Sequence, residues 1–223
     1  EKMVYFGPWE TYFLVAEALE RQWVTPGEVG GLTAENAYNK AVKLSFIHFG
    51  VSQYYDDYIS SREYNRVGTS VAYNHTDPAS SVTMKYVDGY TDQEGTVQYQ
   101  YPDGTRTLYG NQLNDHLSKI FTQKYIAQLP YLVQECWSDY RRVGLPFFDI
   151  IANEKMMTGT DMTEWDPESW KSGQKWQYYP QRMRYPTTLD NANPTEYKHA
   201  LELLGGANTT MVPLWWSLAY SQK

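Results

Sequence analysis

Two stretches of sequence decide the fold: PWETYFLVAEALERQW at residues 8–23 and TAENAYNKAVKLSFIHF at residues 33–49. In both, apolar and small residues recur every three or four positions, which predicts helices with one buried face. Pro8 suits the first turn of a helix, Thr33 is a predicted N-cap, and Gly50 follows the second stretch as a stop. We therefore expect two helices, joined by the glycine-containing break at residues 25–31.

The two predicted helices together resemble one tetratricopeptide repeat. The first carries Trp9, Tyr12 and Ala16 at the matching spacing, and the second carries Ala37-Tyr38. Small alanines let two helices approach closely, but a single repeat cannot bury both of its faces, so such repeats normally stack. We expect neighbouring repeats upstream, and hence a chain that is the C-terminal part of a longer domain.

Residues 51–110 form a polar region that is rich in tyrosine, in contrast to the helical pair at residues 1–50. Ten tyrosines fall here: Tyr54, Tyr55, Tyr58, Tyr64, Tyr73, Tyr86, Tyr90, Tyr99, Tyr101 and Tyr109. The triplet Pro102-Asp103-Gly104 predicts a tight turn, residues 96–101 alternate like a short strand, and residues 54–63 include a predicted helix. A long polar connection is uncommon in a compact domain unless it is functional, so we expect an irregular region with a binding role.

Residues 111–223 return to a helical pattern. Apolar spacing predicts helices over residues 110–129, 130–142 and 194–204, with Gly144 and Gly205 as C-terminal stops. Between them, residues 153–185 form a second irregular stretch with Trp165, Trp170 and Trp176. The predicted fold class is mainly α, with long irregular loops and few short strands.

Composition narrows the class of partner and of chemistry. The chain has 223 residues and a formal net charge of -7, and its longest cationic cluster is Arg141-Arg142, so nucleic acid is excluded as a partner. The single cysteine, Cys136, rules out an internal disulfide and a cysteine cluster for zinc, and its apolar helical setting predicts a buried, inert thiol. No apolar run is long enough to predict a transmembrane helix.

The sequence does not favour an enzymatic role. A glycosidase needs two carboxylates that flank one bond, and none of the candidates stands in a recognisable catalytic frame: Asp56, Asp57, Asp88, Asp92, Asp103, Asp161 and Asp166. His48, His75, His116 and His199 are scattered, which argues against zinc. We predict no cofactor, with calcium at Asp88, Asp92 and Glu94 left open because these residues could supply oxygen ligands from one loop.

A series of ordered motifs in the second half carries a family resemblance. Gln123-Lys124 with Ala127 is followed by Glu135-Cys136-Trp137 and by the run from Arg141-Arg142 to Gly144-Leu145-Pro146, then by Arg182-Met183-Arg184-Tyr185-Pro186, Asn191 to Asn193 and Trp215-Trp216. In order and type these resemble the C-terminal part of the SusD/RagB family, with its QKxxA, ExWxxxRRxGxP and RxxYP patterns. The resemblance covers nearly the whole chain.

The resemblance implies a mainly helical SusD-like fold and a function without catalysis. Family members are extracytoplasmic lipoproteins of the outer membranes of Bacteroidetes, anchored through a cysteine near the mature N-terminus. They deliver glycans or, in the RagB branch, peptides to a TonB-dependent SusC-type transporter. Cys136 does not match the anchoring cysteine, so we expect the anchor in an N-terminal half that is absent here.

Exposed rings suit sugars, since aromatic faces stack on the C–H faces of a pyranose. We predict that the ligand surface includes Trp165, Trp170 and Trp176, with a contribution from Tyr86, Tyr90, Tyr99 and Tyr101. The alternative is that the tryptophans pack their loop onto the helices. Arg141, Arg142 and the segment at residues 184–186 are interpreted as structural. Two other functions stay open, namely peptide binding of the RagB kind and a tetratricopeptide scaffold for protein partners.

Overall fold

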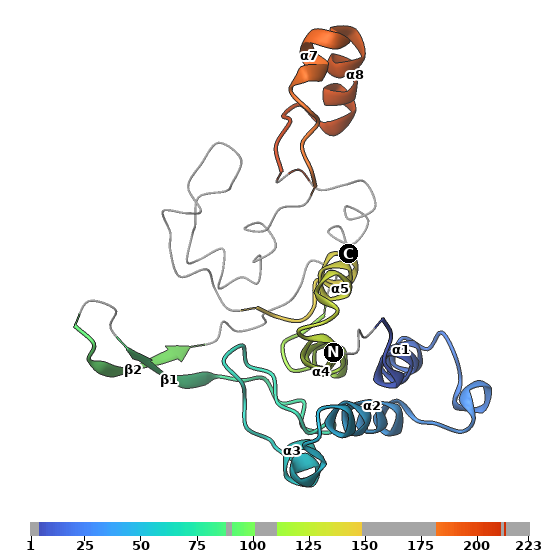
Figure 1. Cartoon of the computed structure of the whole chain (residues 1–223), viewed down its shortest axis with the longest axis vertical. Helices are drawn as coiled ribbons and strands as arrows, with labels where there is room; N and C mark the ends of the chain where they lie inside the picture. The colour runs from blue at the N-terminus through green and yellow to red at the C-terminus, as the bar shows by residue number, and fades with distance from the viewer. Residues whose placement is uncertain (1–4, 88–90, 101–110, 149–181, 211, 213–223) are drawn as a thin grey trace.

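The computed structural model describes residues 5–87, 91–100, 111–148, 182–210 and 212 (Figure 1). Its helices are α1 (Pro8–Glu20), α2 (Ala34–His48), α3 (Tyr55–Ile59), α4 (His116–Gln128), α5 (Val133–Val143), α7 (Thr188–Ala192) and α8 (Pro194–Leu204), with short 3-10 helices at Pro26–Val29 and Ser52–Tyr54. One antiparallel hairpin joins β1 (Ser81–Val87) to β2 (Glu94–Gln100). The prediction of a mainly α fold is confirmed.

Both α1 and α2 begin where the sequence predicts, and α2 also ends at its predicted position. Pro8 occupies the first turn of α1, and the hydroxyl of Thr33 accepts a hydrogen bond from the backbone N–H of Asn36 at 3.1 Å. Gly50 ends the second helix with a left-handed φ of 70°. A side chain at position 7 would collide with the ring of Trp9, so glycine fits at the position before α1.

The main core lies between α1, α2 and α4. The alanines at positions 16, 37 and 41 are fully buried, as is the ring of Phe13, so the two helices pack through small residues with aromatic rings filling the gaps. Tyr38 is also fully buried and donates a hydrogen bond to the carbonyl of Val71 at 2.7 Å. The predicted small-residue face of the pair is confirmed.

The first helix is shorter than predicted at its C-terminal end. It ends at Glu20, and Gln22 adopts a left-handed φ of 57°, so the chain turns away before Trp23. Trp23 therefore lies outside the helix with 65% of its surface exposed, although the predicted helix extends to residue 23. The backbone N–H of Trp23 bonds instead to the carbonyl of Ala18, which closes the helix end.

Both helices of the second pair begin later than predicted. α4 begins at His116 rather than near residue 110, because Asn114 is left-handed (φ 62°) and the carboxylate of Asp115 caps the backbone N–H of Ser118 at 2.6 Å. α5 begins at Val133 rather than at Pro130, and its end at Val143 precedes the left-handed Gly144 (φ 69°) as expected. A second apolar cluster joins Leu113, Phe121, Val143, Leu145, Phe147 and Ala79.

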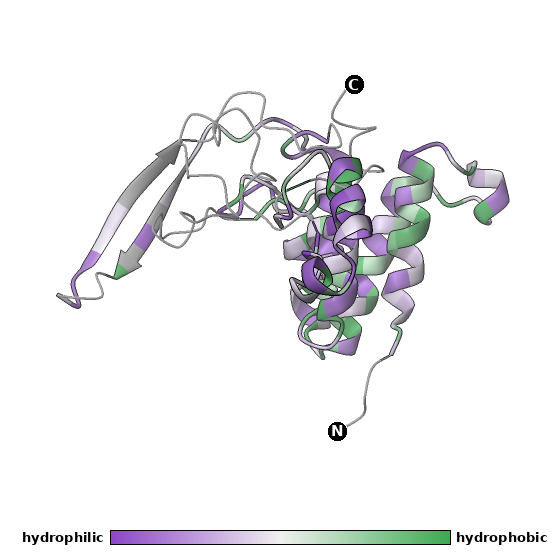
Figure 2. Cartoon of the chain, turned by 90° about the horizontal axis from the view of Figure 1, so that it is seen from above, coloured by the Kyte–Doolittle hydropathy of each residue, from purple (hydrophilic) through white to green (hydrophobic). Residues whose placement is uncertain are grey.

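The hairpin lies inside the region that was expected to be irregular. The ladder pairs Ser81 with Gln100 and Val87 with Glu94, so the predicted strand at residues 96–101 is found in part, with a partner strand that was not predicted. Residues 81–87 alternate polar and apolar in sequence, which was a usable strand signal. The hairpin projects away from the helices in both views (Figures 1 and 2).

The last two helices, α7 and α8, pack on each other. α8 matches its predicted bounds, with Pro194 in its first turn and Gly205 (φ 88°) at its end. The tight turn at residues 102–104 and the pair Trp215-Trp216 lie outside the described residues. Within the described ranges, no helix combines the length and apolarity that crossing a bilayer requires.

Candidate functional site

The hairpin is the part of the predicted ligand surface whose backbone the structure describes. The register pairs Tyr86 with Gly95 and Tyr99 with Val82, so Tyr86 and Tyr99 belong to the same face of the ladder, four residue pairs apart. Two predicted site residues therefore share a face. Tyr90, Tyr101, Trp165, Trp170 and Trp176 lie outside the described residues, so their roles stay predictions.

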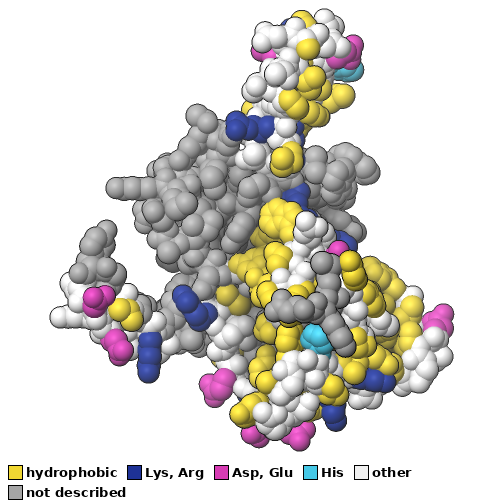
Figure 3. Space-filling view, in the orientation of Figure 1, with side chains coloured by type: hydrophobic (Ala, Val, Ile, Leu, Met, Phe, Trp, Pro, Cys, Tyr) yellow, Lys and Arg dark blue, Asp and Glu magenta, His cyan; other side chains and the backbone are white. Residues whose placement is uncertain are grey.

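The opposite face of the hairpin is exposed and mostly polar, with Val87 as an exposed apolar side chain at its end. It carries Thr83, Lys85, Glu94 and Thr96, and an open pocket of about 530 Å³ is bordered by Lys85, Val87, Glu94, Gly95 and Thr96. The space-filling view shows charged side chains of both signs on the hairpin, whereas apolar side chains gather over the helices (Figure 3). Hydroxyl, amine and carboxylate groups on one exposed ribbon can exchange hydrogen bonds with a polar ligand.

The predicted calcium ligands are described only in part. Asp92 and Glu94 flank the start of β2, while Asp88 lies outside the described residues. Among the residues that the structure does describe, no group of three or more His, Cys, Asp or Glu side chains is arranged for a metal ion. The expectation of no cofactor, with calcium at this loop left open, therefore stays a prediction.

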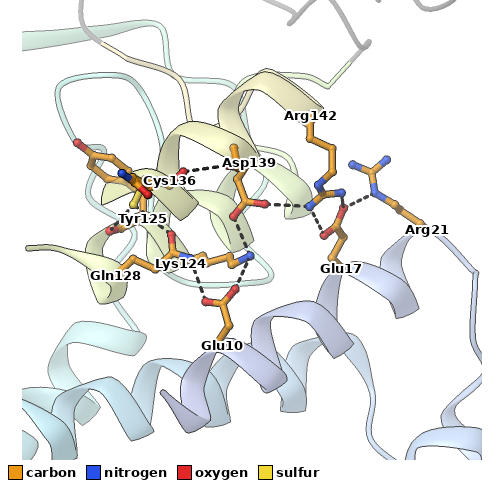
Figure 4. A network of polar contacts seen from close by, with 11 residues as sticks. Glu10, Glu17, Arg21, Lys124, Tyr125, Gln128, Cys136, Asp139 and Arg142 are labelled. Carbon is orange, nitrogen blue, oxygen red and sulfur yellow. Dashed lines mark hydrogen bonds and ion pairs between the residues drawn. The ribbon is translucent and has the colours of Figure 1, made fainter. Parts of the chain in front are cut away.

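The QKxxA and RRxGxP motifs fasten α4 and α5 to the first helix (Figure 4). The ammonium of Lys124 lies 2.7 Å from a carboxylate oxygen of Glu10 on α1 and 2.7 Å from one of Asp139 on α5. The guanidinium of Arg142 reaches Glu17 on α1 with two hydrogen bonds, at 2.6 and 2.8 Å. The structural interpretation of Arg142 agrees with these contacts.

Each charge in this network is matched by a partner of opposite sign. Burial alone would raise the pKa of Glu17, but the hydrogen bonds and charges of Arg142 and Arg21 outweigh it and hold the pKa below its usual value. Burial alone would lower the pKa of Lys124, and Asp139 and Glu10 outweigh it in the opposite direction. Both shifts favour the charged forms of Glu17 and Lys124, and the ion pairs of the network join three helices.

Cys136 packs behind this network. Its Sγ donates to the side-chain carbonyl of Gln128 at 3.1 Å, and the amide of Gln128 donates to Glu10 at 3.0 Å. Burial raises the pKa of the Cys136 thiol to about 11, and the charge of Asp139 adds to the shift. The predicted inert, buried thiol is consistent with this setting.

A second buried polar cluster lies where the chain approaches the hairpin, and sequence reasoning missed it. The ammonium of Lys119 contacts Ser70 and Asn114, and the hydroxyl of Ser70 lies 2.9 Å from Nδ1 of His75. The sequence signal that could have located it is the pair Asn114-Asp115, because asparagine tolerates a left-handed backbone and aspartate is a preferred N-cap. The partners on residues 70–77 are distant in sequence, so no local pattern marks them.

The RxxYP motif is held by Asn208, which sequence reasoning also missed. The side-chain amide of Asn208 both accepts from the backbone N–H of Tyr185 and donates to its carbonyl, each at 2.9 Å. Arg182 donates to the carbonyl of Thr209 at 2.7 Å, and its guanidinium stacks 4.7 Å from the centre of the Tyr185 ring. The segment is extended and structural, as predicted.

Comparison with known proteins agrees with this architecture. A family model described as SusD-like, "Susd and RagB outer membrane lipoprotein", matches residues 1–217. A solved SusD homologue from Parabacteroides distasonis is 30% identical with a TM-score of 0.55, and the match covers 93% of this chain and 32% of that one. The search of curated proteins found no match.

Two further solved structures share the fold. A chitin-binding SusD homologue from Flavobacterium johnsoniae is 23% identical with a TM-score of 0.53, covering 94% of this chain and 35% of that chain. A SusD homologue from Bacteroides vulgatus is 22% identical with a TM-score of 0.52, covering 96% and 35%. The chain thus spans about a third of the length of the solved homologues that it matches.

Proposed function

The chain belongs to the SusD-like family of outer membrane lipoproteins, and we propose that it is part of a cell-surface protein that binds a nutrient oligosaccharide or polysaccharide without catalysis. The match of the family model over residues 1–217 carries this proposal. The motif residues Lys124 and Arg142 form ion pairs that join the helices, which fits a structural role for them rather than a ligand contact. Ligand contacts are therefore assigned to the hairpin and to the irregular stretches.

The proposed ligand surface consists of Trp165, Trp170 and Trp176 with the tyrosines of the hairpin region. Its described part is the shared ladder face of Tyr86 and Tyr99. Tyr90 and Tyr101 follow the two strands in sequence and complete the proposed set. Stacking on aromatic rings would supply affinity, and polar side chains near the rings would supply hydrogen bonds to sugar hydroxyls.

We further propose the location and partner that the family implies. The protein would reside on the extracellular face of the outer membrane and pass its ligand to a SusC-type TonB-dependent transporter. Cys136 is buried against Gln128, so a lipid anchor would use a cysteine other than this one. Protease accessibility on intact cells and co-purification with a SusC-type transporter would test location and partner separately.

The binding proposal is tested by isothermal titration against a panel of polysaccharides, chitin oligosaccharides and oligopeptides. Alanine at Trp165, Trp170 or Trp176 should weaken binding by about 5- to 150-fold, because one stacked ring contributes on the order of 1–3 kcal/mol. Trp23→Ala is the matched control, since Trp23 is an exposed ring outside the proposed surface. Unchanged affinity in all three tryptophan variants would overturn the assignment.

Peptide binding is the second candidate, because the matching family model names RagB together with Susd. The same panel separates the two candidates. Saturable binding to oligopeptides with none to saccharides would favour the RagB kind, and turnover of any saccharide would contradict a function without catalysis.

A further inference from the structure

We infer that Lys119 and Asn114 are positioning residues that hold the hairpin β1–β2 on the helical core. Neither residue belongs to the proposed ligand surface, yet both fix the chain just before it enters β1. The inference rests on the proposed function only in its consequence for binding, since Tyr86 and Tyr99 lie on this hairpin. The position of the hairpin itself can be measured without a ligand.

The ammonium of Lys119 is enclosed by three oxygens. It donates to the carbonyl of Ser70 at 2.9 Å, to the hydroxyl of Ser70 at 2.7 Å and to the side-chain oxygen of Asn114 at 2.7 Å. Lys119 is fully buried, and its three N–H groups match these three acceptors. Lys119 thus bonds to both the backbone carbonyl and the hydroxyl of Ser70, which fixes the backbone at this position.

Asn114 fixes further backbone positions between Ser70 and β1. Its side-chain oxygen accepts from the backbone N–H of Ser70 at 2.8 Å, and its amide donates to the carbonyls of His75 at 3.0 Å and Asp77 at 2.6 Å. Asn114 is fully buried and has a left-handed φ of 62°. One side chain thus fixes three backbone positions, and the last of them lies four residues before β1 begins at Ser81.

Apolar packing also attaches the segment before β1 to the helices. Ala79 is buried in the cluster of Phe121, Val143 and Leu145, two residues before β1. On the other side of the hairpin, the side chain of Asn111 donates to the carbonyl of Val143 at 3.0 Å. The described approaches to both strands are therefore attached to α4 and to the end of α5, while the hairpin projects from them (Figures 1 and 2).

Several titratable groups surround the ammonium. Asp115 lies on the same helix end, and His75 contacts Ser70, with Tyr64 and Asp77 beyond it at 3.5 Å from Nε2 of His75. Across α4, His116 contacts Glu20, which also accepts from Tyr73. Burial lowers the pKa of Lys119 to about 8, against a smaller opposing effect of Asp115.

Because of this pKa, the equilibrium between the attached and the detached hairpin should depend on pH. When the hairpin detaches and Lys119 meets water, its pKa returns towards 10.5, so the detached state binds more protons between about pH 8 and 10. Raising the pH through this window therefore disfavours detachment. Below about pH 8 both states are protonated, and the contribution of Lys119 to the detachment equilibrium is independent of pH.

The test measures spin-label distances between cysteines introduced at the exposed positions Lys43 and Thr96, in the full chain with Cys136→Ser. A narrow distance distribution is expected when Lys119 is present. Lys119→Met should broaden it, with the detached population rising at least about tenfold, because the three hydrogen bonds of Lys119 are lost and their acceptors at Ser70 and Asn114 stay buried. Ser70→Ala, which keeps the Ser70 carbonyl, should give a smaller rise.

The matched control is Lys124→Met, which removes the other buried ammonium of α4, whose partners are Glu10 and Asp139. It should leave the hairpin distance unchanged, with circular dichroism reporting whether each variant is folded. If Lys119→Met does not fold, Ser70→Ala and the pH series of the parent protein decide. An unchanged distribution in folded Lys119→Met, or equal broadening in Lys124→Met, would overturn the inference.

A pH series adds a readout that packing alone would not move. The detached fraction of the parent should fall as the pH rises from 8 to 10, and this dependence should vanish in Lys119→Met. Titration of the parent with the saccharide and peptide panel tests the proposed function alone. Absence of any binding would contradict the proposed function and would not affect the conclusion about the hairpin.

Discussion

Lys124 and Glu17 lie at the centre of the ion pairs that join α1 to α4 and α5. Glu10 and Glu17 are almost fully buried on the same stripe of α1 as Trp9, Phe13 and Ala16. A buried charge is tolerated when its partner is close and well aligned, and here every described partner comes from another helix or from the next turn of α1. These side chains determine how the helices dock.

Replacing Lys124 with methionine should cost about 3–5 kcal/mol of unfolding free energy, because it leaves the buried Glu10 without its cation and Asp139 with Arg142 alone. Arg142→Met should cost less, since Arg21 still pairs with Glu17 at 2.8 Å and the Arg142 side chain is partly exposed. Urea unfolding of both variants checks the order. A larger loss in Arg142→Met would contradict the view that burial sets the cost.

The ion pairs also predict how stability depends on pH. The pKa of Glu17 in the folded protein lies below its reference value of 4.5, so its contribution is complete above about pH 4.5 and is lost as the pH falls through the lower, folded pKa. Glu17→Gln should reduce stability at pH 7 and flatten the acid limb. Urea midpoints measured from pH 7 down to pH 3 would show this, and parallel curves for parent and variant would refute it.

At the scale of elements, helix starts are set by single side chains. Asp115 caps α4 through Ser118 and also accepts from the backbone N–H of Gln112 at 2.8 Å, so it fixes the turn and the helix together. This is why α4 begins at His116 although apolar spacing extends further towards the N-terminus. Thr33 has the simpler role on α2, with one capping hydrogen bond.

Asp115→Ala should lower the unfolding free energy by about 1–2 kcal/mol, at the upper end for an N-cap because the side chain has two backbone partners. Thr33→Ala should cost about 0.5–1 kcal/mol. Thermal unfolding followed by circular dichroism would rank the two variants. Equal losses would mean that the bond to Gln112 adds nothing.

Sequence patterns correctly predicted the features that depend on residues close together in the sequence. The starts of α1 and α2, the bounds of α8 and the alanine face of the helical pair follow from apolar spacing, proline and small residues near one another in sequence. Strand β1 was missed although residues 81–86 alternate polar and apolar, whereas the burial of Glu10 and Glu17 was missed because their main partners lie more than a hundred residues away. The buried anchor at Lys119 escaped for the same reason, with Ser70 at a separation of 49 residues. Of the candidate site, sequence alone supplied the tyrosines, and the register supplied their common face.

At the scale of the molecule, the described chain is not uniformly packed. Five residues of α2 are buried, whereas in α8, all of whose residues the structure describes, none is buried. α7 and α8 pack on each other, and Asn208 ties Tyr185 to the segment that follows α8. Local stability follows buried contacts, so the two regions should open independently.

Native-state hydrogen exchange should show this difference directly. Amides in the centre of α2 should exchange only through global unfolding, and amides of α8 should exchange at least about a hundredfold faster through local opening. Addition of low concentrations of urea should leave the exchange of α8 nearly constant and accelerate that of α2. Matching protection in both helices would show that α8 is part of the same cooperative unit.

The buried thiol of Cys136 has a practical consequence. It is the single cysteine of the chain, it is shielded between α4 and α5, and its pKa of about 11 keeps it protonated at neutral pH. A thiol-specific alkylating reagent can therefore reach it only when these helices separate. Mass spectrometry of the alkylated fraction over time would therefore measure the rate of core opening. The native Cys136 serves as the reporter, so no label site has to be introduced.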